Sequence, residues 1–320
     1  MLVLVGTVIG GGFASGREIG TYFLKNGESA LWSMVVFGAV FFVICLKVCL
    51  ICKKENITTV DKFFKTVFGN NKGKVVYFFV ALFSFMVLCS MLSAMAELGA
   101  YYWNEGKLFL RIVFSLMLCV VLSKGFGGVE YVNRCLVPVL VVGIAVLGVM
   151  SDGKIKPVFC SGKIILPFVS SIIYTCYNMI TVIPALVELS CGKSKRENAV
   201  SCFLSSVVLF GCAWCIGNII SAGFEENMLF SIPVIRAVAG DDRLMIITTT
   251  VVLFSMATTV VSSACWVKDY IYEKTGDNHY VFLSVLALGM SFFPFSVFVD
   301  RMYFVFSALA LLVMGRILIY

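Results

Sequence analysis

The sequence begins MLVLVGTVIGGGFASGREIG (residues 1–20), in which two apolar runs are separated by a glycine-rich stretch. Three consecutive glycines, Gly10 to Gly12, forfeit roughly 2 to 3 kcal/mol of helix propensity relative to alanine. Residues 1–10 would rise about 15 Å as a helix, which is half the thickness of a bilayer's hydrocarbon core. The stretch is therefore a candidate for a transmembrane helix that is interrupted near the middle of the membrane.

The composition is that of an integral membrane protein. Of the 320 residues, 60% are hydrophobic and only 13% are charged, and the mean hydropathy is +1.00, whereas soluble domains are about a quarter charged. The net charge of +7 would suggest nucleic acid in a soluble chain, but here lysine and arginine gather in loops, as topology signals do. We expect the lipid bilayer and not a nucleic acid as the partner, and we interpret the 13 cysteines as reduced apolar residues.

Ten apolar stretches have about the length that spans a bilayer. They are residues 2–24, 29–52, 75–102, 108–123, 129–150, 164–189, 199–222, 244–271, 280–297 and 302–320. The charged stretch between the second and third is expected to form a short surface helix. The stretch after the seventh, FEENMLFSIPVIRAVAGDDR, is expected to form a short helical lid.

Ten spans divide into two sets of five at the loop 151–163. Because five is odd, the second set enters the membrane from the opposite face, which is the arrangement of inverted-repeat transporters. The sequence thus predicts an all-α membrane domain with one repeat in residues 1–150 and the inverted repeat in residues 151–320. Such folds begin each half with a broken helix. The sixth stretch carries Pro167 and Pro184 around a polar cluster, so we expect the first and the sixth helices to be broken.

Other interpretations of the opening stretch fit less well. A dinucleotide-binding loop needs alternating strands and amphipathic helices, and a signal peptide needs a basic n-region. Gly12, Gly16 and Gly20 have the four-residue spacing that lets helices approach closely. That packing is compatible with a break, but it does not explain three consecutive glycines.

A broken helix offers groups of both polarities to a ligand. Freed amides around Phe13, Ala14 and Ser15 would favour a carboxylate, and carbonyls at the end of the inner half would favour a cation. A small zwitterion fits that pairing. The candidate substrate-binding residues flank the two predicted breaks: Gly10, Gly11, Gly12, Phe13, Ala14, Ser15, Tyr174, Tyr177 and Asn178.

The string GTVIGGGFASGREI (residues 6–19) resembles the opening of the YkvI-type membrane proteins, a group of amino acid permeases in the amino acid, polyamine and organocation transporter superfamily. YTCYN (residues 174–178) is similar to that family's second broken segment. The resemblance implies a LeuT-type fold, with substrate held between the first and sixth helices and released by alternating access. Arg17 stands where glutamine is usual in the family, so a shared substrate or coupling ion does not follow from the resemblance. Because the chain starts almost at the motif, we expect the natural start to lie upstream.

A sodium ion is a candidate for coupling, because the LeuT-type fold often holds one between carbonyls of helix one and paired hydroxyls of helix eight. Val8 and Ile9 would supply the carbonyls, and hydroxyls are the hard ligands that such a cation prefers. The eighth stretch fits the hydroxyl pattern twice, in Ser255 with Thr258 and Thr259, and in Thr259 with Ser262 and Ser263. The same hydroxyls would also suit helix packing.

A rival for the same place is Arg134 on the fifth helix, which carries its own charge or pairs with Glu130. Sodium and proton coupling therefore both stay open.

Ionisable residues inside a membrane are costly and are functional candidates by default. Glu97 near the outer end of the third helix would line a vestibule, sense protons or belong to the interfacial belt. Arg17 and Glu18 would form an external gate with Asp300, or Arg17 would snorkel to the interface.

The function that these features predict is secondary active transport of a small amino acid or related zwitterion across the plasma membrane. The sequence has one histidine, His279, in a predicted loop, and neither HExxH nor GxSxG occurs, so an enzyme is not expected. No cofactor is expected beyond sodium, and the oligomeric state is open. The alternative is an amino-acid-sensing receptor subunit of the same fold, similar to germinant receptors.

The distribution of basic residues predicts the topology. With a cytoplasmic N-terminus, twelve lysines and arginines fall in cytoplasmic loops and eight in external ones, so both termini are expected in the cytoplasm. In intact cells, an impermeant thiol reagent should label a cysteine placed at Glu226 and spare one placed at Lys195. The reverse labelling pattern would invert the topology.

Overall fold

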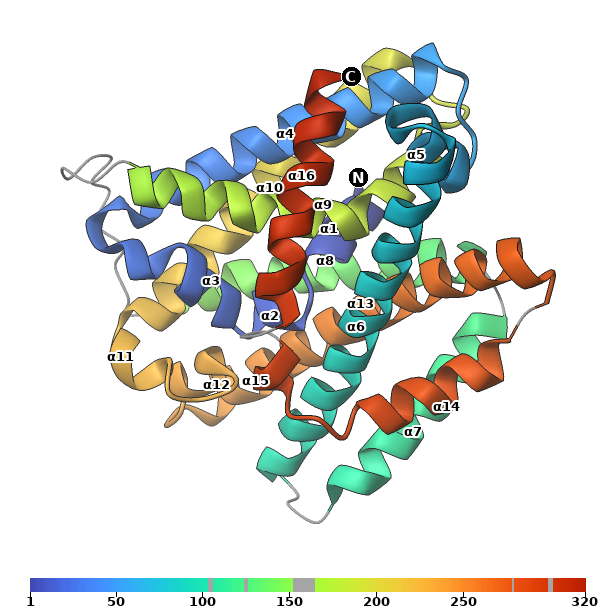
Figure 1. Cartoon of the computed structure of the whole chain (residues 1–320). Helices are drawn as coiled ribbons and strands as arrows, with labels where there is room; N and C mark the ends of the chain where they lie inside the picture. The colour runs from blue at the N-terminus through green and yellow to red at the C-terminus, as the bar shows by residue number, and fades with distance from the viewer. Residues whose placement is uncertain (103–105, 124–125, 152–164, 278, 299–301) are drawn as a thin grey trace.

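The computed structural model describes residues 1–102, 106–123, 126–151, 165–277, 279–298 and 302–320, and the regular secondary structure in these ranges is helical (Figure 1). Within them, six helices are long and apolar enough to cross a membrane. They are α4 (Ala30–Lys54), α6 (Asn70–Tyr102), α8 (Phe126–Met150), α9 (Ile165–Ser190), α10 (Lys195–Ser221) and α13 (Asp242–Thr275). These six match six of the ten predicted spans in order.

The other four predicted spans form shorter helices. The fourth is α7 (Lys107–Ser123), the ninth is α14 (Tyr280–Met290) followed by α15 (Phe295–Val297), and the tenth is α16 (Tyr303–Ile319). The first is divided into the three pieces described next.

The first predicted span is interrupted twice. It consists of α1 (Leu2–Val8), α2 (Gly11–Ala14) and α3 (Arg17–Tyr22), followed by the 3₁₀ helix η1 (Leu24–Ser29). Gly10 is extended at the first interruption, with φ −93° and ψ −175°. Gly16 is left-handed at the second, with φ +81°, a conformation that glycine adopts without steric cost. The predicted break is confirmed, and a second break follows it.

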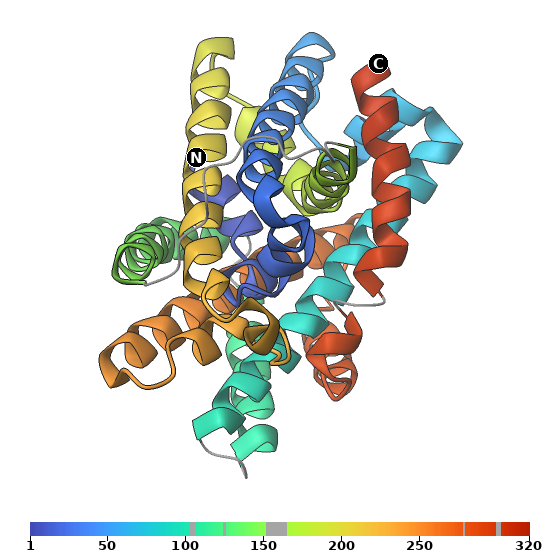
Figure 2. The ribbon, with the colours of Figure 1, turned by 90° about the vertical axis from the view of Figure 1, so that its left-hand side faces the viewer.

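The interrupted segment lies in the middle of the bundle (Figures 1 and 2). It packs against α9 on one side and α13 on the other, and α1 also contacts α8 and α10. α9 packs in turn on α4 and α16, and α13 packs on α6 and α8. The helices around the segment thereby provide the protein surroundings that non-helical backbone requires at membrane depth.

The sixth predicted span is not broken, contrary to expectation: α9 is one continuous helix. It contains no glycine, and Pro184 lies inside it, where it removes one backbone hydrogen bond without ending the helix. The polar cluster also bonds back along the helix, since Thr175 Oγ1 donates to the Ser171 carbonyl at 2.7 Å and Asn178 Nδ2 to the Tyr174 carbonyl at 2.9 Å. These side chains are satisfied locally and do not require unwinding.

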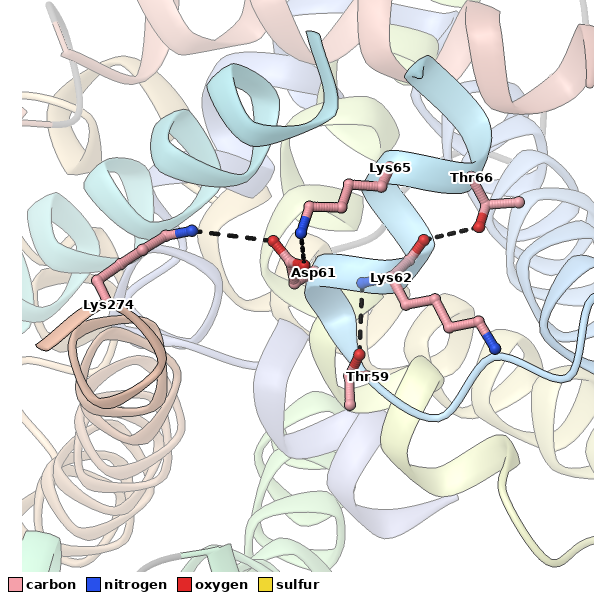
Figure 3. A network of polar contacts seen from close by, with 6 residues as sticks. All are labelled: Thr59, Asp61, Lys62, Lys65, Thr66 and Lys274. Carbon is pink, nitrogen blue, oxygen red and sulfur yellow. Dashed lines mark hydrogen bonds and ion pairs between the residues drawn. The ribbon is translucent and has the colours of Figure 1, made fainter. Parts of the chain in front are cut away.

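The predicted surface helix is present as α5 (Val60–Phe68), whose apolar side packs on α6. On its polar side Asp61 pairs with Lys65 one turn along, and Lys274 Nζ of α13 lies 3.9 Å from Asp61 Oδ1 (Figure 3). The salt bridges therefore tie α5 to the end of α13.

Nine of the described lysines gather at one face, which we name the lysine-rich face. It is formed by α5, the ends of α4 and α13, and the starts of α6 and α10. Its lysines are Lys53, Lys54, Lys62, Lys65, Lys72, Lys74, Lys193, Lys195 and Lys274. Arg316 Nε donates to the Val67 carbonyl at 3.2 Å, so the C-terminal helix also ends there.

The opposite face carries the predicted lid. It contains two short helices, α11 (Phe224–Asn227) and α12 (Pro233–Ala237). The Val234 amide donates to the Ser15 carbonyl at 3.0 Å, so the lid is fixed to the second interruption of the first segment. We name this the lid-side face.

Gly16 offers a test of the second interruption. Gly16→Ala should lower the melting temperature of the purified protein more than Gly192→Ala. Both glycines have φ near +80°, so both substitutions bear the left-handed cost of about 1–2 kcal/mol. Only at Gly16 would the new Cβ also lie 2.8 Å from Val234 Cγ2, whereas nothing lies within 4 Å of it at Gly192. Equal shifts in the two variants would show that the lid contact contributes nothing to stability.

Candidate functional site

The backbone of the first interruption contacts its neighbours directly. A Cβ at Gly10 would lie 2.9 Å from Thr259 Oγ1 of α13. The Gly11 amide donates to the sulfur of Met91 on α6 at 3.2 Å. This stretch therefore has no space for side chains, and its polar groups face α6 and α13.

The amides predicted to be free in this stretch are partly engaged. The Ala14 amide donates to the Gly10 carbonyl at 2.8 Å and the Ser15 amide to the Gly11 carbonyl at 2.9 Å. Both bonds close the single turn of α2. The expectation of free amides at these two positions was wrong, because the chain forms a helical turn there and does not unwind.

Glu18 points into the protein. Its side chain is 5% exposed, and a Cβ at Gly12 would collide with its Oε1. The hydroxyl of Tyr174 on α9 donates to Glu18 Oε2 at 3.2 Å. The carboxylate therefore lies between the first interruption and α9, which is the place that the sequence assigns to substrate.

Aromatic rings hold Tyr174 in position. Its ring packs edge-on against Phe23 and Phe37, with centroids 4.9 and 5.0 Å away, and against Tyr177 at 5.3 Å. Such contacts from three directions restrict the ring. The hydroxyl that contacts Glu18 is thereby fixed.

A cavity of about 30 Å³ lies beside Glu18, with room for about two water molecules. Residues of α1, α6, α9, α13 and α16 line it together with the glycine stretch. The lining is Thr7, Val8, Gly10, Gly12, Glu18, Phe83, Val87, Met91, Tyr177, Asn178, Thr181, Thr259 and Tyr303.

Four of the nine predicted substrate-binding residues line this cavity directly: Gly10, Gly12, Tyr177 and Asn178. Tyr174 reaches it through Glu18, while Phe13, Ala14 and Ser15 are buried beside it. The sequence analysis missed the α6 residues, although Phe83, Val87 and Met91 recur at the four-residue spacing of one helix face.

One of the predicted ion-binding hydroxyls, that of Thr259, lies against the same interruption. Thr258 and Thr259 both donate to the Ser255 carbonyl, at 2.9 and 3.1 Å, and Thr259 also lies against Gly10. Val8 and Ile9 are buried at the end of α1. The first hydroxyl pattern and the predicted carbonyls are thus brought to the same place.

The second hydroxyl pattern lies further along α1. Asn133 Nδ2 of α8 is 3.4 Å from Ser262 Oγ, and a Cβ at Gly6 would collide with Asn133 Oδ1. Ser263 is buried on the same helix. Arg134, the predicted rival for the ion's place, is exposed on α8, so the buried polar residue at this position is its neighbour Asn133. Asparagine in an apolar span was the signal that could have identified it.

Arg17 and Glu18 point in different directions. Arg17 Nη1 donates to the Met228 carbonyl at 2.7 Å and approaches the Phe230 carbonyl at 3.4 Å, so Arg17 ties the lid to α3. Glu97 Oε1 accepts a hydrogen bond from the Phe295 amide at 2.9 Å, which fixes α15 to α6. Asp300 lies outside the described residues.

A wider hollow lies on each side of the central cavity. The one at the lid-side face is about 520 Å³ and is lined by Glu97, Tyr101, Lys107, Phe230, Ser231, Ile232, Ile235, Arg236 and Pro294. The one at the lysine-rich face is about 80 Å³ and is lined by Thr58, Thr59, Val60, Tyr77, Val80, Ala81, Ser84, Pro184, Glu188, Trp266, Asp269 and Glu273.

Comparisons with known proteins support the membrane assignment and the fold. No family model matches the chain. The chain is 31% identical over 144 residues to YkvI, an uncharacterized membrane protein of Bacillus subtilis (strain 168). The match covers 44% of this chain and spans only 40% of the length of YkvI.

Among solved structures, the chain is similar to MhsT, which was crystallised in complex with L-phenylalanine. The TM-score is 0.61 at 14% identity, and the match covers 99% of this chain and 86% of MhsT. The likeness shows that the chain shares the fold of MhsT, which is LeuT-type.

Proposed function

We propose that the protein is a secondary transporter that moves a small amino compound across the plasma membrane by alternating access. One observation carries this proposal: a small buried cavity at an interrupted helix lies between hollows that open on opposite faces. Transporters with broken helices hold substrate at such a midpoint. The similar MhsT was crystallised with L-phenylalanine, which carries an amino group.

Three helices, α6, α9 and α13, contribute residues both to the central cavity and to the hollow at the lysine-rich face. On α9, Thr181 lines the cavity and Pro184 lines the hollow, about one turn apart. On α6, Phe83 and Ser84 are adjacent in sequence and line one each. Small shifts of these helices would therefore join the two spaces.

Toward the lid-side face the cavity is closed by polar contacts. Val234 and Arg17 fix the lid to the first segment, and Ser93 Oγ of α6 donates to the Phe293 carbonyl at 2.7 Å. We propose that breaking these contacts opens the path to this face. We further propose that residues 1–150 and 151–320 form the two inverted repeats, with the lysine-rich face in the cytoplasm.

Sodium is the coupling ion that we favour. Thr258, Thr259 and the Ser255 carbonyl cluster on α13 beside the end of α1, and carbonyls of Val8 and Ile9 would complete an oxygen site. Oxygen ligands of this kind suit a hard cation. Proton coupling stays the alternative.

Uptake into proteoliposomes tests the function. The wild-type protein should accumulate a labelled small amino compound, and Gly12→Leu should abolish both uptake and ligand-induced thermal stabilisation. A side chain at Gly12 would displace Glu18 and fill the cavity, while the surrounding apolar length still inserts the chain.

The matched control is Gly20→Ala, which meets the flexible side chain of Met228 outside the cavity. It should lower stability and keep ligand-induced stabilisation, which follows ligand affinity by mass action. Full stabilisation in Gly12→Leu would move the substrate site elsewhere. Binding without any accumulation would favour the sensing receptor instead.

The sodium site can be tested with two pairs of consecutive threonines on α13, one at the proposed site and one away from it. Replacing Thr258 and Thr259 together by alanine should abolish sodium stimulation of uptake. Replacing Thr249 and Thr250, which also bond back to carbonyls of their own helix at 2.8 Å, should leave it intact. Uptake that ignores sodium and follows a pH gradient would contradict the assignment.

A further inference from the structure

The central cavity has a single ionisable side chain, apart from tyrosines, among the described residues that line it. That group is the carboxylate of Glu18, and its lining partners are otherwise apolar, aromatic, hydroxyl or amide. Burying a carboxylate is costly unless a charge or several donors compensate it. A bound cation would supply that compensation.

The position of Glu18 also disfavours a carboxylate on the ligand. Its Oε1 occupies the space beside Gly12, and the Ala14 and Ser15 amides are taken by α2. A ligand carboxylate at this point would lie against Glu18, where two like charges at low dielectric repel strongly. The lining has no lysine, arginine or histidine to offset that repulsion.

The rest of the lining suits a protonated amine. Phe83, Tyr177 and Tyr303 present aromatic rings, whose faces attract ammonium groups. The hydroxyls of Thr7 and Thr181 lie in the same lining and can accept N–H hydrogen bonds. An ammonium group would thus meet one carboxylate, several rings and neutral acceptors.

The hollow at the lysine-rich face, like the central cavity, has acidic but no basic side chains in its described lining. Glu188, Asp269 and Glu273 line it, and its described lining contains no basic side chain. A hollow lined by one sign of charge concentrates the opposite ion. The route between the cavity and this face therefore favours a cation over a zwitterion or an anion.

We propose that the substrate is a small organic ammonium without a carboxylate, held by an ion pair between its nitrogen and Glu18. This inference rests on the proposed transport function and assigns the substrate class to it. Glu18 is then the specificity-determining residue, and Tyr174 is a positioning residue that orients the carboxylate.

Matched ligand pairs test the inference. Purified protein is titrated with glycine and methylamine, and with alanine and ethylamine, and binding is followed by thermal shift in detergent. The amine of a pair should stabilise the wild type, and its amino acid should not. Glu18→Gln should lower amine affinity at least tenfold, whereas the control Glu28→Gln, at an exposed carboxylate of η1, should leave it unchanged.

Tyr174→Phe provides a second variant if Glu18→Gln does not fold. It keeps the ring contacts and removes the hydroxyl that fixes Glu18, so amine affinity should fall severalfold.

Each other outcome is decisive. Binding of amino acids but not of amines would overturn the inference and leave the transporter proposal standing. If the Glu18→Gln variant gains affinity for amino acids and keeps its affinity for amines, Glu18 blocks the site and does not bind the ligand. That result would also overturn the inference. If no ligand of either class binds the folded wild type, the proposed function itself fails.

Discussion

The fold depends on the need to satisfy backbone groups that no helix satisfies. Inside a bilayer, an unwound backbone is tolerated only when protein or a water-filled cavity surrounds it. The segment from Gly10 to Gly16 contains an extended residue and a left-handed one, and it is buried throughout. Different elements form hydrogen bonds with its backbone: the Gly11 amide donates to the sulfur of Met91 on α6, and the Ser15 carbonyl accepts from an amide of the lid.

That requirement explains the arrangement of the neighbouring helices. α9 and α13 flank the interrupted segment, and both present small hydroxyl or aromatic groups to it. The glycines allow the close approach, because a Cβ at Gly6, Gly10 or Gly12 would meet a polar side chain of the site. The glycines in and beside the first interruption therefore allow the side chains of the site to approach it.

Sequence reasoning predicted the break, the surface helix and the lid, because glycine runs, charge and amphipathic pattern are local signals. It failed where the outcome depends on tertiary contacts. Pro184 suggested a second break, but α9 is continuous, and its polar side chains bond back to their own helix and do not require unwinding. Asn133 was overlooked beside Arg134, since only the packing of α8 on α1 and α13 decides which of the two is buried. The inward turn of Glu18 likewise follows from Gly16, whose left-handed φ redirects α3.

The two sides of the site differ in rigidity, because α9 is one continuous helix and the first segment is interrupted twice. α9 offers a rigid wall whose Tyr174 is held by rings on three sides, so its hydroxyl defines a fixed point. The first segment has two interruptions at which φ and ψ can change, and α3 carries Glu18 on the far side of both. A rotation at Gly16 would move the carboxylate relative to that fixed point and would strain the Arg17 contacts with the lid at the same time. In the proposed transport cycle, occupancy of the cavity and closure of the lid-side face would therefore be coupled through Arg17 and Glu18, which are adjacent residues of α3.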